Sequence, residues 1–225
     1  DVIESMLQAF QEETPVTIRC NLAKTTPENL KESLQKEGVT VTPHPYLSYA
    51  FRIQDYDHLS ELESFQKGEF YVQDISSMLV GELADPKKGD RVIDVCAAPG
   101  GKATALGAKL AGEGLLVAND ISASRAKALL KNLEIFGIRN SFVTNAYPAK
   151  LAEQFAGAFD KILVDAPCSG EGMFRKDLAN ARVWSLEKVK ECAKTQHEII
   201  RQAVSMLRPG GLLLYSTCTF AKEED

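Results

Sequence analysis

The chain has 225 residues, of which 44% are hydrophobic and 25% charged, with a formal net charge of -5 at pH 7. This composition is ordinary for a globular protein with one full domain and a smaller unit, and no apolar run approaches the ~20 residues that span a bilayer. The negative charge does not indicate a nucleic-acid binder, and the five scattered cysteines contain no C-x-x-C pair, so we expect a cytoplasmic protein with reduced thiols and no metal site.

Residues 1–67 predict a small α+β domain built from short elements. The expected elements, in chain order, are a strand at 16–22, a helix at 27–37, extended structure at 39–41, a strand at 49–53 and a helix at 59–65. Pro27 suits the first turn of its helix, and Gly38 suits its end.

Residues 68–225 predict a second, larger domain. After a strand at 70–72 and a helix at 75–83, the expected strands lie at 91–96, 115–119, 141–144, 161–164 and 212–216. The expected helices lie at 102–110, 124–136 and 185–207. Short apolar strands that alternate with helices are typical of a parallel sheet covered on both faces. Right-handed crossovers then give a doubly wound, mostly parallel, Rossmann-like α/β sheet.

A loop of small residues follows the first of these parallel strands. It consists of Ala97, Ala98, Pro99, Gly100, Gly101, Lys102 and Ala103. Small residues let a ligand approach the backbone, and the N-terminus of the next helix offers free N–H groups. The loop lacks the G-x-G-x-x-G spacing of dinucleotide binders, so S-adenosylmethionine fits better than NAD, although a tight strand-to-helix turn alone would also use two glycines.

Polar residues follow the next two strands. Asp120 ends the strand at 115–119, where a carboxylate can hold the hydroxyl pair of a ribose. Asn145 and Tyr147 follow the strand at 141–144, a position that can flank an adenine. An ordinary polar loop explains Asn145 and Tyr147 equally well, so the spacing leaves both interpretations open.

Two cysteines and a carboxylate follow the last two strands. Asp165 and Cys168 come after the strand at 161–164, and Cys218 comes after the strand at 212–216, so all three are expected at the edge that holds the cofactor loop. A thiolate that adds to carbon 6 of cytosine makes carbon 5 able to attack an electrophilic methyl group. A carboxyl group at the N3 edge would assist the addition, and a second cysteine could help to remove the carbon 5 proton.

The opposing interpretation is that a cysteine at a strand end is a small buried hydrophobe. We apply that interpretation to Cys20, Cys96 and Cys192, and we favour function for Cys168 and Cys218 because Asp165 lies nearby.

Three motifs in order resemble the NOL1/NOP2/Sun family of RNA cytosine-C5 methyltransferases. They are DVCAAPGGK at 94–102, DAPCSG at 165–170 and STCT at 216–219. The run SGEGMFRK at 169–176 is most similar to the bacterial branch that modifies small-subunit ribosomal RNA. Three motifs in the correct order are far more specific than any one of them.

The resemblance implies a role for each matching residue. Cys218 would be the nucleophile, Cys168 would help to release the product, and Asp165 would contact the target cytosine. Lys102 would lie in the active site, and the loop 97–103 would hold S-adenosylmethionine. Asp120 would bind the ribose of this cofactor, with Arg125 close by.

The same resemblance implies that the partner is 16S ribosomal RNA, contacted by the N-terminal domain, and we expect the chain to be monomeric. Two features depart from the family pattern. Asn145 stands where an aspartate is common near the adenine, and the chain stops at Asp225, only seven residues past Cys218. We therefore expect a fragment whose methyltransferase domain is truncated at its C-terminus.

Three other functions remain in competition. A DNA cytosine methyltransferase would take its nucleophile from the Pro-Cys motif, which would make Cys168 the attacking thiol. An amine methyltransferase needs no thiol, and its Asn/Asp-Pro-Pro-aromatic motif is absent from the sequence. An RNA-binding or assembly protein without activity could keep the same fold, but the retention of both cysteines and Asp165 argues against it.

Overall fold

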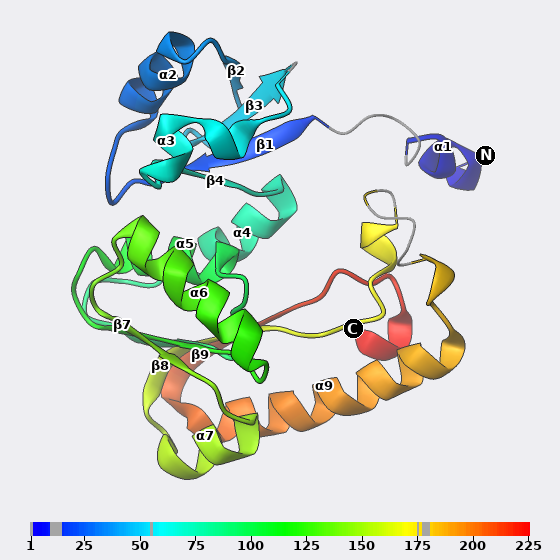
Figure 1. Ribbon diagram of the computed structural model, residues 1–225. Coiled ribbons are helices and arrows are strands. Elements are labelled where there is room, and N and C mark those ends of the chain that lie inside the picture. Colours follow the sequence, from blue (N-terminus) through cyan, green and yellow to red (C-terminus); the bar gives the residue numbers. More distant parts are fainter. Residues whose placement is uncertain (1, 10–14, 55, 175, 177–180) are drawn as a thin grey trace.

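Two sheets organise the part of the chain that the structure describes. The computed structural model describes residues 2–9, 15–54, 56–174, 176 and 181–225. An antiparallel sheet lies at the centre of an N-terminal unit, drawn in blue and cyan in Figure 1. A parallel sheet organises the second unit.

The N-terminal sheet has four strands in the order β2-β3-β1-β4, with every pair antiparallel. The strands are β1 (Val16–Cys20), β2 (Thr40–Pro43), β3 (Ala50–Gln54) and β4 (Phe70–Val72). The helices of this region are α1 (Val2–Ala9), α2 (Pro27–Lys36) and α3 (Glu63–Gln66), with a 3-10 turn η1 (Leu59–Glu61). This arrangement confirms the predicted small α+β unit.

Helix α2 shows why its segment folds as the sequence predicts. The Thr26 hydroxyl accepts a hydrogen bond from the Asn29 backbone N–H at 3.2 Å, and Pro27 occupies the first turn. Leu30 and Leu34 lie one turn apart and are fully buried in the core of the N-terminal unit.

Strand β4 belongs to the N-terminal sheet. Its residues pair with β1, with Phe70 opposite Cys20 and Val72 opposite Ile18. The N-terminal sheet therefore extends past residue 68, where the sequence places the start of the second domain.

The second sheet has five parallel strands in the order β7-β6-β5-β8-β9. The strands are β5 (Arg91–Asp94), β6 (Leu115–Asn119), β7 (Ser141–Thr144), β8 (Phe159–Asp165) and β9 (Leu207–Ser216). The chain adds strands on one side of β5 and then returns to add β8 and β9 on the other. The strand order thus reverses between β5 and β8, which is where such sheets bind ligands.

Helices cover both faces of the parallel sheet. They are α4 (Ile75–Ala84), α5 (Gly101–Leu110), α6 (Ala123–Phe136), α7 (Pro148–Gln154) and α9 (Leu186–Met206). One apolar cluster joins the sheet to α4, α5 and α6, and a second joins it to α7 and α9. The predicted doubly wound sheet is therefore confirmed.

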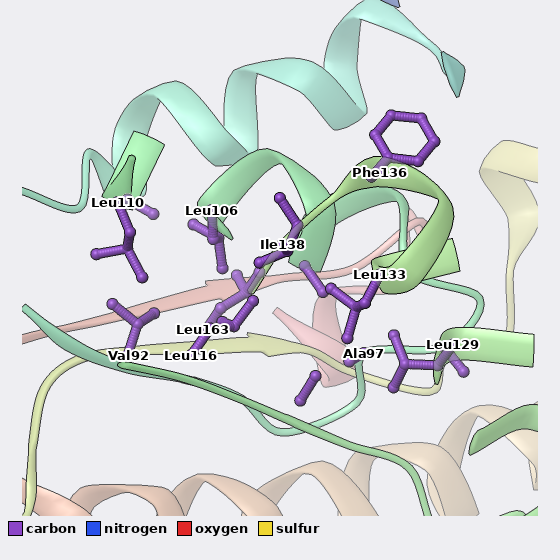
Figure 2. Packing of buried hydrophobic residues seen from close by; sticks show 14 residues of the cluster. Val92, Ala97, Leu106, Leu110, Leu116, Leu129, Leu133, Phe136, Ile138 and Leu163 are labelled. Atoms are coloured by element: carbon purple, nitrogen blue, oxygen red, sulfur yellow. The ribbon is translucent and has the colours of Figure 1, made fainter. Parts of the chain in front are cut away.

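Figure 2 shows the first of these clusters at close range. Leu106 of α5 and Leu133 of α6 point toward Leu116 and Leu163 of the sheet, and all four side chains are 0–2% exposed. Burial of this apolar surface is the main favourable contribution to folding, and it fixes the start of α5 against the sheet.

The N-terminal unit is held against helix α6. The Asn21 side chain donates to the carbonyl oxygens of Gly68 and Phe136 at 2.8 and 3.1 Å, and Lys24 donates to that of Ile135. A Cβ atom at Gly68 would lie 2.5 Å from the Ile135 carbonyl oxygen, so only glycine permits this close approach.

No helix within the described residues is both long and apolar enough to cross a membrane.

Candidate active site

A cleft of about 980 Å³ opens at the point where the strand order reverses. Loops after β5, β8 and β9 line one side of it, and residues of β1, β4 and α4 line the other. Asp94, Lys102, Asp165, Ser216 and Cys218 all contribute to its lining. The cleft therefore lies between the N-terminal unit and the carboxyl edge of the parallel sheet.

The predicted cofactor loop forms part of this lining. Ala97, Ala98, Pro99, Gly101 and Lys102 contact the cleft. The first two alanines are nearly buried, and the peptide bond between Ala98 and Pro99 is cis.

The other two residues of this loop, Gly100 and Ala103, fit its backbone conformation and the core beneath it. Gly100 has a φ of +116°, and a Cβ atom there would lie 3.2 Å from a methyl group of Leu129, so glycine suits both the conformation and the packing. Ala103 is fully buried in the core beneath the loop and does not line the cleft.

Asp120, Arg125 and Asn145 form one connected group beside the loop. The Arg125 guanidinium donates to the Ala98 carbonyl oxygen at 2.8 Å and lies 3.2 Å from the Asp120 carboxylate. Asn145 donates to the Asp120 carbonyl oxygen at 2.7 Å, and the Ser122 N–H donates to the Asp120 carboxylate at 2.9 Å. The three predicted residues are thus brought together, next to the cleft rather than within its lining.

The two predicted cysteines lie against each other, and Cys218 lines the cleft while Cys168 lies behind it. The sulfur atoms of Cys168 and Cys218 lie 3.2 Å apart, and the Cys218 N–H donates to the Cys168 sulfur at 3.4 Å. The contact between the two sulfur atoms lowers the pKa of Cys218 to about 7, against burial and the charge of Asp165, which both raise it. The positive charge of Lys102 lowers it further.

The same contact raises the pKa of Cys168 well above its ordinary value. Both shifts have the direction expected if the Cys168 thiol donates its proton to a Cys218 thiolate. The thiolate is the nucleophilic form of cysteine, so the lowered pKa of Cys218 favours it as the attacking thiol.

Asp165 lies between Lys102 and the end of β9. One carboxylate oxygen is 2.7 Å from the Lys102 ammonium, and the other accepts a hydrogen bond from the Ser216 hydroxyl at 2.8 Å. A carboxylate has about four lone-pair directions, so both oxygens can still accept a bond from a substrate. Sequence reasoning missed Ser216 because its partner lies on another strand.

Two further carboxylates hold the cysteine loops together. Ser169 and Thr219, the residues after the two cysteines, contact each other at 3.0 Å, and both contact Glu171 and Glu224. Glu224 is 3% exposed, lies in the 3-10 turn η3 (Lys222–Glu224), and also accepts bonds from the Ser169 N–H at 3.1 Å and from Gln196 at 2.7 Å. Sequence reasoning missed this network.

Asp94, at the end of β5, is a fully buried carboxyl group in the lining of the cleft. Neither of its oxygens has a hydrogen bond of good geometry within the described residues. Burial raises its pKa to about 8, and the nearby charge of Asp165 adds to the effect. It therefore carries its proton through most of the neutral range.

The other three cysteines remain protonated thiols. Burial raises the pKa of Cys20 and of Cys96 to about 12, and it also raises that of Cys192. Cys20 is buried as the sequence predicts, whereas Cys96 and Cys192 are only half-buried and Cys96 contributes to the lining of the cleft. Arg175, in the run at 169–176, lies outside the described residues.

Two protein-family models match the chain. The model described as 16S rRNA methyltransferase RsmB/F matches residues 82–225. A model of the ferredoxin-like domain of RsmF/B-like methyltransferases matches residues 1–57. Together they cover the parallel sheet and three of the four strands of the N-terminal sheet, with β4 lying between the matched ranges.

Curated relatives match over nearly the whole chain. A protein named ribosomal RNA small subunit methyltransferase F from Escherichia fergusonii is 40% identical over 99% of this chain and 48% of its own length. A protein of the same name from Vibrio parahaemolyticus is 37% identical over the same shares. The chain spans about half the length of these relatives.

Solved structures share the fold. A methyltransferase homologue from Pyrococcus horikoshii has a TM-score of 0.85 and 30% identity, over 97% of this chain and 69% of that one. NSun6 from the same organism, solved with a compound designated SFG, has a TM-score of 0.88 and 25% identity, over 99% and 80%.

Proposed function

Because the chain belongs to the 16S rRNA methyltransferase RsmB/F family, we propose that it transfers a methyl group from S-adenosylmethionine to carbon 5 of a cytosine in 16S ribosomal RNA, in the cytoplasm. The names of its curated relatives support the substrate. The observation that carries the proposal is the Cys168–Cys218 pair, in which the thiol with the lowered pKa lies beside Lys102 and Asp165.

The cleft has features that suit S-adenosylmethionine. Gly101 contributes to the lining, and a Cβ atom there would lie 3.2 Å from the Tyr71 ring, so the absence of a side chain lets Tyr71 pack closely against the loop. The loop 97–103 would hold the cofactor and Asp120 its ribose, with Arg125 and Asn145 keeping Asp120 in place. The bound cofactor supplies an electrophilic methyl group.

Cys218 begins the reaction as a thiolate. Its sulfur forms a bond to carbon 6 of the cytosine, and the electrons of the C5–C6 double bond become available at carbon 5, which then takes the methyl group. As the thiolate adds, N3 of the ring takes up a proton from solvent, which it loses again when the thiolate departs, and the Asp165 carboxylate, itself paired with Lys102, accepts a hydrogen bond from this N3–H. Ser216 holds the second Asp165 oxygen in place.

Cys168 completes the reaction. Once the Cys218 sulfur is bonded to carbon, it no longer carries the negative charge that kept the proton on Cys168. The Cys168 thiol then releases its proton to solvent more readily, and the resulting thiolate can take the proton from carbon 5. The C5–C6 double bond re-forms, the bond between carbon 6 and sulfur breaks, and Cys218 leaves as the thiolate.

The competing assignment makes Cys168 the nucleophile, as in DNA cytosine enzymes. The raised pKa of Cys168 and the lowered pKa of Cys218 disfavour it, because the attacking thiol must ionise first.

Methyl transfer to defined RNA tests the proposal. The full-length protein, mixed with radiolabelled S-adenosylmethionine and unmodified 16S ribosomal RNA, is expected to yield labelled 5-methylcytosine after nuclease digestion and mass spectrometry. The Cys218→Ala variant is expected to give none while still binding S-adenosylhomocysteine. Transfer to another base, or undiminished transfer by Cys218→Ala, would overturn the proposal.

A further inference from the structure

Arg19 of strand β1 is a buried cation without an acidic partner. Arg19 is only 5% exposed. No carboxylate within the described residues forms an ion pair with its side chain. Burial lowers its pKa to about 10, so it remains protonated at neutral pH. Buried charges are normally paired, and an arginine held this way needs another explanation.

The donors of Arg19 point to the first turn of helix α5. Its Nη1 atom donates to the Gly101 carbonyl oxygen at 2.6 Å, and its Nη2 atom donates to the Thr104 hydroxyl at 2.7 Å. Thr104 in turn donates to the Gly100 carbonyl oxygen at 2.7 Å. Two links therefore connect this guanidinium to the loop that lines the cleft.

Neighbours from both units fix the guanidinium in place, Tyr71 and Gln73 from the N-terminal side and Phe136 from helix α6. Nη1 also donates to the Gln73 side chain at 2.9 Å, and the group lies 5.6 and 5.9 Å from the ring centres of Tyr71 and Phe136. Tyr71 also packs against Gly101. The planar group thus has hydrogen bonds in three directions and aromatic contacts, which a lysine ammonium on a flexible stem cannot reproduce.

We propose that Arg19 is a positioning residue of the cofactor site, acting through Gly101 and Thr104, so that the N-terminal unit sets the affinity for S-adenosylmethionine. This rests on the proposed function. The N-terminal unit then has two tasks, because the same sheet that would contact RNA also holds the loop in its binding conformation. Loss of Arg19 frees the first turn of α5 without removing a group that touches RNA.

Calorimetric titration of the full-length protein with S-adenosylhomocysteine tests this role. Arg19→Lys keeps the charge but loses the fork, and it is expected to weaken binding about tenfold, the effect of one or two lost charge-assisted hydrogen bonds. The KM for S-adenosylmethionine should rise by a similar factor, while kcat and the KM for RNA stay within about twofold. Arg52→Lys, an exposed site on neighbouring β3, is the matched control and should bind as the unchanged protein does.

A second variant guards against misfolding. Thr104→Val removes the hydroxyl that accepts from Nη2 while leaving Arg19 in place, and it is also expected to weaken S-adenosylhomocysteine binding several-fold. If both variants melt cooperatively and still bind S-adenosylhomocysteine within twofold of the unchanged protein, the role of Arg19 alone is overturned. An unchanged protein that binds no S-adenosylhomocysteine would overturn the proposed function together with it.

Discussion

At the scale of single residues, the two site cysteines differ through one shared proton. The 3.2 Å contact stabilises the Cys218 thiolate because Cys168 can donate to it, and Lys102 adds positive charge. The sequence predicts both residues from their motifs. It cannot predict which thiol ionises first, because that depends on the distance between loops separated by 50 residues.

The first prediction concerns the pH dependence of Cys218. Its pKa is lowered, so the thiolate is present above about pH 7 and is lost as the pH falls through that value. Alkylation of Cys218 by iodoacetamide, followed by peptide mass spectrometry, should show a midpoint near pH 7. In Cys168→Ala the hydrogen bond is lost, so the midpoint should rise toward the ordinary value of about 8.5. An identical midpoint in both proteins would refute the shared proton.

The second prediction concerns Asp94, whose pKa is raised from 3.8 to about 8. The folded state binds this proton more tightly than the unfolded state, so Asp94 costs stability as the pH rises from 4 to 8. Asp94→Asn keeps the shape without the charge, and its melting temperature should exceed that of the unchanged protein by a margin that grows over this range. A margin that is constant with pH would contradict the buried, protonated carboxyl group.

At the scale of elements, the sequence predicts which residues lie at the ends of the strands. It does not predict the buried residues that hold those strand ends in place. Apolar strands alternating with helices place Asp165, Cys168 and Cys218 at one edge of the sheet, as the structure has them. Glu224 and Arg19 look like ordinary surface charges in the sequence. Their burial is a tertiary property, and so is the pairing of β4 with β1 instead of with the second domain.

The third prediction tests the network behind the cysteines. Glu224→Gln weakens the bonds to Ser169 and Thr219, so the two cysteine loops should separate. We expect kcat to fall at least tenfold while the affinity for S-adenosylhomocysteine stays unchanged, since one or two hydrogen bonds to a charged group are weakened. Glu223→Gln, at an exposed neighbouring position, is the control. Equal activity of the two variants would show that the network does not position the site.

At the scale of the whole molecule, two units enclose one cleft. The sequence predicts both units and their classes, and the family resemblance implies the cofactor and the RNA. It does not predict that β1 and β4 form part of the cleft, because neither strand carries a motif and their contribution comes from packing against α5.

The fourth prediction concerns the target. A thiolate in a cleft cannot reach carbon 6 of a base that is stacked in a duplex, so the cytosine must be unpaired or flipped out. RNAs that carry one sequence in a hairpin loop or in a rigid duplex should differ in methylation rate, with the loop faster. Equal rates under single-turnover conditions would contradict the account.

The central claim, that Cys218 attacks and Cys168 releases, is tested most directly by trapping the covalent adduct. Full-length Cys168→Ala, mixed with S-adenosylmethionine and 16S ribosomal RNA, should accumulate a protein–RNA complex that survives denaturing electrophoresis. The complex should disappear when Cys218 is also replaced by alanine. A stable complex in Cys218→Ala that requires Cys168 would reverse the two roles and contradict the account.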